Sequence, residues 1–277
     1  AQISLPRNIR LIDGGVLPNI PVGAAVSIQV GYDLDNVEVF TGYVARIGAD
    51  LPIVLECEDE MWTLKQTIVS ESWSKVSLRI MLNSILPSSI VYDAPEVDLG
   101  AFRIDQVSVA KVLEILQRQY GLRSYFQANV LYVGFAHSRD PDQHTYSFQE
   151  DVVSSGLEYR LKENTRLQVR AVSMQTDNTK LEVKLGDEGG EQRTLHYYNL
   201  DQATLQTRAE AELDRLKVDG YRGSFQAFGD PICRHGDVAE VLDNEYPDRA
   251  GAYLVDRVDI QFGQGGYRRE IHLGGKV

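Results

Sequence analysis

The sequence predicts a mainly β protein in which a small α/β part is inserted between two β-rich regions. Short apolar–polar alternations separated by turn residues dominate the residues before about 60 and after about 145. Two longer segments instead show the apolar periodicity of helices. The 277 residues are 43% hydrophobic and 25% charged, which is the composition of a folded protein, and the length suits two domains.

The first β-rich region contains three candidate strands. Apolar side chains alternate with polar ones over Val26–Val30, and the turn-forming residues Gly31–Asn36 follow. Val37–Ile47, in which Gly42 suggests a bend or bulge, and Pro52–Cys57 are the next two. Short strands joined by tight turns predict an antiparallel sheet or a small barrel.

The α/β part begins where the acidic residues Glu58–Glu60 precede a short helix at Met61, since acidic groups favour a helix N-terminus. A second helix is predicted from Ser74, as its N-cap, to Leu86, where Pro87 ends it. A hairpin around Ala128-Asn129 closes the region.

The clearest helix runs from Ser108 to Tyr120, with Ser108 as N-cap and Gly121 just past its end. Apolar residues at helical spacing form one continuous face, which we expect to pack on the small sheet of the insert: Val109, Val112, Leu113, Leu116 and Tyr120.

The polar segment His137–His144 contains Pro141 and is interpreted as a linker. A helix over Asp201–Lys217, ended by Gly220, has Leu205, Ala209, Leu213 and Leu216 on one stripe. The remaining segments after the linker are predicted strands: 157–161, 165–174, 180–185, 192–198, 223–228, 238–242, 252–262 and 267–273. The predicted domains are a first β-barrel at 1–68, an α/β insert at 69–136, and a second β-barrel with helix 201–217 at 137–277.

Charge and composition exclude several classes of protein. The net charge of −12 repels phosphate, so the sequence does not predict a module that grips nucleic acid. An acidic wall past which DNA slides remains compatible with it. We expect no membrane-spanning segment and no signal peptide, although the chain begins at Ala1 rather than Met. Cys57 and Cys233 are expected to be buried thiols in a protein made in the cytoplasm.

Candidate chemical motifs are weak, and we expect no catalytic, cofactor-binding or metal-binding residue. The set His137, Asp140, Asp142 and His144 has no known metal-site spacing. Gly263–Gly266 precedes a strand rather than a helix, which indicates a hairpin turn and not a dinucleotide fingerprint.

Three further groups of residues have a structural interpretation that we prefer. The acids Glu56, Glu58, Asp59 and Glu60 suit a solvated face and a helix start better than a catalytic carboxylate pair. The loop containing Asp33, Asp35 and Asn36 lacks the glycine and distal glutamate of a calcium loop. The 14 tyrosines, with Trp62 and Trp73, are more typical of core or subunit interface than of a sugar groove.

Segments at both ends of the chain resemble phage tail hub proteins, namely the late control D or baseplate hub family, and the hub part of type VI secretion spikes. The resemblance covers most of the chain and lies in the order and spacing of its segments rather than in one motif. At the N-terminal end it is carried by Ile3–Asn8, Val26–Asp33, Val39–Val44 and Leu55–Asp59. At the C-terminal end it is carried by Gly229–Pro231, His235–Val238, Gly251–Val255 and Gly266–Gly274.

The resemblance implies two barrels like those of the tail tube, which in a homotrimer would present six copies to a sixfold tube. It implies a structural role in the virion tail, at the tip or baseplate, with the tail tube, spike or tip and tape measure proteins as partners. DNA would pass through the channel without specific binding. Family members carry strands ahead of the segment that starts at Ile3, so the first barrel is expected to be N-terminally incomplete or differently closed.

Three other functions remain open from the sequence. A hub of a type VI-like contractile injection system would use the same fold. A tail-associated glycan hydrolase would need a carboxylate pair facing a cleft. A carbohydrate-binding module would need exposed aromatic side chains.

Overall fold

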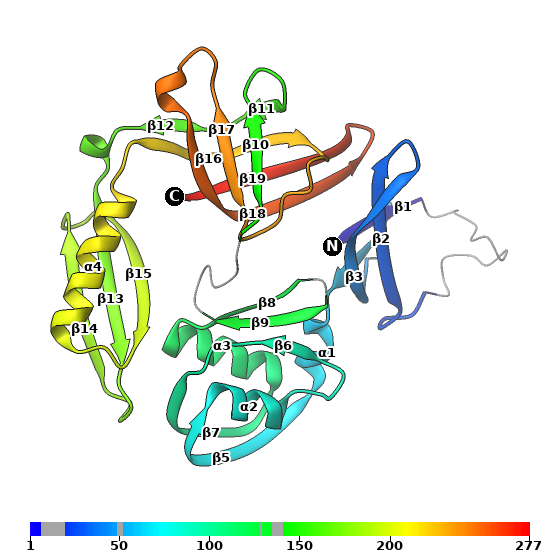
Figure 1. The fold of residues 1–277 in the computed structure, drawn as a ribbon. Helices are drawn as coiled ribbons and strands as arrows, with labels where there is room; N and C mark the ends of the chain where they lie inside the picture. The colour runs from blue at the N-terminus through cyan, green and yellow to red at the C-terminus, as the bar shows by residue number, and fades with distance from the viewer. Residues whose placement is uncertain (7–19, 49–51, 128, 135–140) are drawn as a thin grey trace. The chain divides into compact units, whose positions relative to one another are not determined.

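The computed structural model describes residues 1–6, 20–48, 52–127, 129–134 and 141–277 and divides into two compact units, Ala1–Gly134 and Phe135–Val277 (Figure 1). The β-rich class with a smaller α/β part is confirmed. In the described part of the chain, no helix is both long and apolar enough to cross a membrane.

The first unit begins with an open, curled sheet in the order β1-β4-β3-β2, and every pair in it is antiparallel (Figure 1). Its strands are β1 (Gln2–Leu5), β2 (Ala25–Tyr32), β3 (Asp35–Ile47) and β4 (Ile53–Glu58). The buried core of the sheet is small, consisting of Val44, Leu55 and Cys57. The three strands predicted from alternation are therefore confirmed. The pairing of β3 shifts register between Glu38 and Phe40 and between Val44 and Arg46, on either side of Gly42 rather than at it.

The turn between β2 and β3 is a tight two-residue connection. Tyr32 pairs with Asp35, and the two residues between them, Asp33 and Leu34, have φ angles of 50° and 71°. A two-residue turn with both φ angles positive has the twist that antiparallel hairpins favour. The segment that contains Asp33, Asp35 and Asn36 is thus a hairpin, in line with the rejection of a calcium loop.

The rest of the first unit is an α/β layer in which the apolar faces of the helices pack against the strands. Its helices are α1 (Met61–Gln66), α2 (Leu78–Ile85) and α3 (Val109–Tyr120). One sheet pairs β5 (Ile68–Ser77) with β7 (Asp98–Ser108), and the other has the order β6 (Val91–Asp93), β9 (Val130–Gly134), β8 (Arg123–Gln127). The hairpin around residues 128–129 is confirmed as β8–β9, although Ala128 lies outside the described residues.

Helix α3 forms as its sequence predicts. The Lys111 backbone N–H donates to Ser108 Oγ at 3.2 Å, and Gly121 ends the helix with a φ of 72°. The predicted apolar face packs on β7 and β8, and its members are at most 4% exposed: Val109, Val112, Leu113, Leu116 and Tyr120.

The helix predicted to start at Ser74 is wrong at its N-terminus. Residues 68–77 form β5, which pairs with β7, so the chain stays extended until Ser77. The side chain of Ser77, not of Ser74, accepts the Ile80 N–H and caps α2. Pairing with β7, a strand that the sequence analysis did not predict, overrides the local helical preference.

The second unit is built on a curled seven-stranded sheet with the order β10-β17-β18-β19-β16-β11, and β12 also pairs with β16 (Figure 1). Its strands are β10 (Gln143–Ser147), β11 (Val152–Ser155), β12 (Glu158–Arg160), β16 (Gly220–Phe228), β17 (Val238–Leu242), β18 (Gly251–Gly263) and β19 (Gly266–Lys276). Two short 3₁₀ turns, at Lys162–Asn164 and Pro247–Arg249, lie in its loops.

Two features of this sheet depart from the sequence analysis. Gln143 and His144 lie in β10 and not in a linker, while residues 135–140 are outside the described range. Strand β10 also pairs with β17 in parallel, so the sheet is mixed rather than wholly antiparallel. Alternation of side chains predicts that a segment is a strand, but it contains no information about the direction of its partner.

An α/β layer is inserted between β12 and β16. Strands β13 (Leu167–Met174), β14 (Lys180–Gly186) and β15 (Glu191–Tyr198) form a three-stranded sheet, and α4 (Gln202–Leu216) lies across it (Figure 1). The predicted stripe of α4 packs on this sheet, with Leu205 and Ala209 fully buried. The domain boundaries at residues 68 and 136 stay a prediction.

We expect Leu113→Ala to lower the free energy of unfolding by about 2–5 kcal/mol, because it removes a side chain that is 1% exposed from the contact of α3 with its sheets. The neighbouring Glu114→Ala, which removes only an exposed ion pair with Lys111, should change it by less than about 1 kcal/mol. Urea unfolding followed by circular dichroism measures both. Equal effects of the two substitutions would contradict the packing described here.

Candidate functional site

The acidic residues at the end of β4 and before α1 all have local structural partners. Asp59 Oδ1 accepts the Met61 backbone N–H at 2.9 Å, and burial raises the pKa of its carboxyl. The other three each accept from a neighbouring side chain: Glu56 from Arg46, Glu58 from Lys65 at 2.6 Å, and Glu60 from Tyr43 at 2.9 Å. The group therefore stabilises the strand-to-helix junction, as the structural interpretation expected.

The histidine and aspartate set of the predicted linker is not brought together as a group. His137 and Asp140 lie outside the described residues, and the backbone carbonyl of Asp142 accepts the Val238 N–H. His144 alone joins a buried cluster, described below. Gly263–Gly266 forms the β18–β19 hairpin turn, which confirms the turn predicted there.

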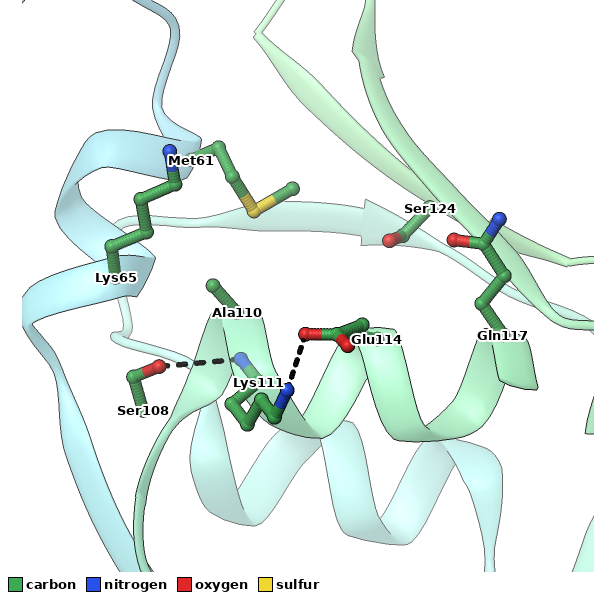
Figure 2. Close-up of a pocket in the computed structure, with 8 residues that line it drawn as sticks. All are labelled: Met61, Lys65, Ser108, Ala110, Lys111, Glu114, Gln117 and Ser124. Atoms are coloured by element: carbon green, nitrogen blue, oxygen red, sulfur yellow. Dashed lines mark hydrogen bonds and ion pairs between the residues drawn. The ribbon is translucent and has the colours of Figure 1, made fainter. Parts of the chain in front are cut away.

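A shallow cavity of about 330 Å³ lies between α1, α3 and β8 (Figure 2). Six of its eight lining residues are polar or charged, and its two lysines are already paired: Lys111 with Glu114 at 2.7 Å, and Lys65 with Glu58. Its lining residues are Met61, Lys65, Ser108, Ala110, Lys111, Glu114, Gln117 and Ser124. Each lysine of the cavity thus faces a carboxylate of opposite charge.

The most constrained polar group in the second unit is the guanidinium of Arg269, which is 1% exposed. Its Nε donates to the Gly229 carbonyl at 2.7 Å, and Nη1 donates to the Cys233 carbonyl at 3.0 Å. The third nitrogen, Nη2, donates to the hydroxyl of Tyr267 at 2.6 Å. A buried guanidinium is tolerated only when its donors are satisfied, so these bonds hold the 229–237 loop against β19.

The 229–237 loop is held at its other end by Asp237, which is fully buried. Its Oδ2 accepts the backbone N–H of Arg234 at 2.7 Å and lies 3.2 Å from His144 Nε2 on β10. Cys233 and Tyr146, both fully buried, lie next to this pair, and burial raises the pKa of the Cys233 thiol to about 12. We call His144, Tyr146, Cys233, Asp237 and Arg269 the loop cluster.

The loop cluster gathers residues from three distant parts of the sequence. Two of them, Asp237 and Arg269, belong to segments that carried the resemblance to tail hub proteins, His235–Val238 and Gly266–Gly274. The sequence analysis did not single out Arg269 itself. A signal was present, since Arg269 shares the inward-facing period of β19 with Tyr267, Ile271 and Leu273, all buried.

Solved structures with a similar fold cover almost the whole chain. A tail protein from Neisseria meningitidis MC58 matches 88% of this chain and 81% of its own, with 18% identity and a TM-score of 0.57. The 43 kDa tail protein of prophage MuSo2 from Shewanella oneidensis matches 100% and 88%, with 14% identity and a TM-score of 0.59.

The chain has the fold of phage tail proteins. A secretion-system protein has a similar fold. E. coli c3393 matches 95% of this chain and 66% of its own; it is a component of the type VI secretion system and is described as similar to the T4 tail proteins gp27 and gp5. There the identity is 9% and the TM-score 0.56. Neither a protein-family model nor a curated protein sequence matches the chain.

We expect Arg269→Met to lower the free energy of unfolding by about 3 kcal/mol or more, because it removes the charged donors that bind the buried carbonyls of Gly229 and Cys233. The adjacent Arg268→Met is the control, since Arg268 is half-buried and donates only to the Tyr267 carbonyl while stacking over Phe228. Urea unfolding compares the two. A loss in Arg269→Met no larger than that in Arg268→Met would show that the 229–237 loop does not depend on the guanidinium.

Proposed function

We propose that this chain is a structural hub of a phage or prophage tail tip or baseplate. In this proposal three copies form a ring that joins the tail tube to the spike and encloses the channel for DNA, and the chain carries out no catalysis. The observation that carries the proposal is the tail-protein fold, which matches the prophage MuSo2 tail protein over the whole of this chain.

The surface supports a role in assembly. Large apolar side chains are exposed at the tips of two hairpins: Leu34 of β2–β3 is 95% exposed and Phe262 of β18–β19 is 67% exposed. Phe262 keeps a ring contact with Tyr267 within the chain, but most of its surface and nearly all of that of Leu34 stay exposed and suit contact with a neighbouring subunit. The partners proposed are two further copies of this chain, the tail tube protein, the spike or tip protein and the tape measure protein.

The charge of the chain suits a channel for DNA. The net charge is −12, and a wall of the same sign as phosphate does not retain DNA as it leaves. The location that follows is the virion tail, after synthesis in the bacterial host cytoplasm. In this proposal DNA passes without specific binding, and two barrel domains separated by an α/β domain present the ring to the tube.

A hub of a type VI-like contractile injection system is the second candidate. The similarity to the E. coli secretion component over 95% of the chain favours it. Such a hub would also join a tube to a spike, but it would not conduct a genome. A tail-associated glycan hydrolase finds less support, because the acids singled out between β4 and α1 hold local structure.

Light scattering against salt tests self-assembly. We expect the mass of three chains of 31.1 kDa each at high protein concentration, and more trimer as salt rises. Three chains of charge −12 carry −36 in total, and salt screens their repulsion, whereas apolar subunit contacts are not weakened by it. A trimer that dissociates as salt is added would contradict this charge argument. If the protein stays a monomer under all conditions, three copies could assemble only when the tail tube and spike proteins bring them together.

Leu34 allows assembly to be separated from folding. At a φ of 71° a leucine is strained and a glycine is not, so Leu34→Gly should raise the stability of the chain by up to about 1 kcal/mol. The same change removes the exposed side chain, so it should weaken the trimer. Thermal unfolding of the monomer and light scattering of the trimer measure the two effects, with Asp105→Ala, at an exposed site, as control. Unchanged assembly in Leu34→Gly would exclude this hairpin tip from the interface.

A further inference from the structure

Three side chains of the loop cluster have the chemistry of metal ligands and already lie close together. The ligand atoms of His144, Cys233 and Asp237 are all within 4.8 Å of one another. The imidazole comes from β10, while the thiol and the carboxylate come from the 229–237 loop before β17. Their positions 144, 233 and 237 match no metal-binding sequence motif, because the fold and not the local sequence brings them together.

The spacing of these atoms suits a small tetrahedral ion. Bonds of about 2.0–2.3 Å to nitrogen, oxygen and sulfur place tetrahedral ligand atoms about 3.3–3.6 Å apart. His144 Nε2 and Asp237 Oδ2 are 3.2 Å apart, and Cys233 Sγ, which lies within 4.8 Å of both, needs a shift of at most about 1.2–1.5 Å. The backbone N–H of Arg234 already orients the Asp237 carboxylate, as outer-shell donors do for metal ligands.

A second observation is independent of the three ligands. The Tyr146 hydroxyl is fully buried beside the Cys233 thiol, and it has no partner at hydrogen-bond geometry. A buried hydroxyl without a hydrogen-bond partner is costly, and native proteins rarely retain one. An ion bound by Cys233 would place a positive charge next to the oxygen of this hydroxyl.

We propose that His144, Cys233 and Asp237 bind one Zn²⁺ ion, with the fourth position directed toward the Tyr146 hydroxyl. A thiolate, an imidazole and a carboxylate are a donor set typical of zinc. On binding, the Cys233 thiol loses its proton to solvent as the sulfur–zinc bond forms, and His144 binds as the neutral ring. The His144 side chain is 16% exposed, which gives the ion a route to the otherwise buried ligands.

The ion would join β10 to the 229–237 loop, two segments that are about 90 residues apart in the sequence. Its role is therefore structural: it adds a link between the loop and β10, besides the hydrogen bonds that the Arg269 guanidinium makes to the same loop. A second group, Asp259, Glu270 and His272, also has ligand-type atoms within 4.8 Å, but its members are only half-buried and already engage Arg257 and Ser224. We propose no metal site at that group, and its member His272 serves as a control.

The test uses tag-free full-length protein stripped with EDTA, then given ZnCl₂ and desalted. We expect one zinc per chain by elemental mass spectrometry, a higher Tm with zinc, and a sulfur-to-metal charge-transfer band when Co²⁺ replaces zinc. Cys233→Ser and His144→Gln should lose the zinc. Removal of an outer-shell partner lowers metal affinity by about 10–100-fold, and we expect a larger loss of zinc affinity in these two variants. Cys57→Ala and His272→Gln should bind as the unmodified protein does.

Circular dichroism of each variant establishes that it is folded. If Cys233→Ser does not fold, His144→Gln carries the test, since its side chain lies at the edge of the cluster. Failure of the unmodified protein to retain zinc overturns the proposal. Retention of zinc and of the charge-transfer band in His144→Gln also overturns it, and loss of zinc in Cys57→Ala would place the site elsewhere.

Discussion

The burial of the Arg269 guanidinium is the constraint on which the second unit depends. A charged group that is 1% exposed must have its donors satisfied, and the groups that do so are carbonyls of the 229–237 loop and the Tyr267 hydroxyl. The loop therefore cannot move away from β19 without exposing that charge to solvent or leaving it buried without hydrogen-bond acceptors. Because Asp237 lies at the end of the same loop and reaches His144 on β10, the constraint passes from the interior strand β19 to the edge strand β10.

A sheet held in this way presents surfaces of fixed shape. Contacts with other subunits depend on such surfaces more than on a pocket. Two strongly exposed apolar side chains, Leu34 and Phe262, lie at hairpin tips, while Lys111 and Glu114 of the shallow cavity neutralise one another. The two α/β layers bury the apolar faces of their helices within their own sheets, as α4 does over β13–β15. This distribution of apolar surface fits a protein that works through contacts with other subunits.

Local patterns predicted the helices and most of the strands. The α3 helix was predictable residue by residue, because its cap, its apolar face and its final glycine are all local signals. Pairing was not predictable: β5 takes Ser74 into a strand only because β7, about 30 residues later, lies beside it. The loop cluster was missed for the same reason, since His144, Cys233 and Arg269 meet only after the strands have paired. A period-2 pattern on β19 did contain the inward position of Arg269.

The central claim is that three copies of this chain enclose a channel whose wall does not retain DNA. A reconstruction of the assembled protein by electron cryomicroscopy, followed by a census of the side chains that face the pore, tests it most directly. The account predicts a threefold ring in which Asp, Glu and neutral polar side chains outnumber Lys and Arg along the pore. A ring whose pore is lined mainly by Arg and Lys would contradict it.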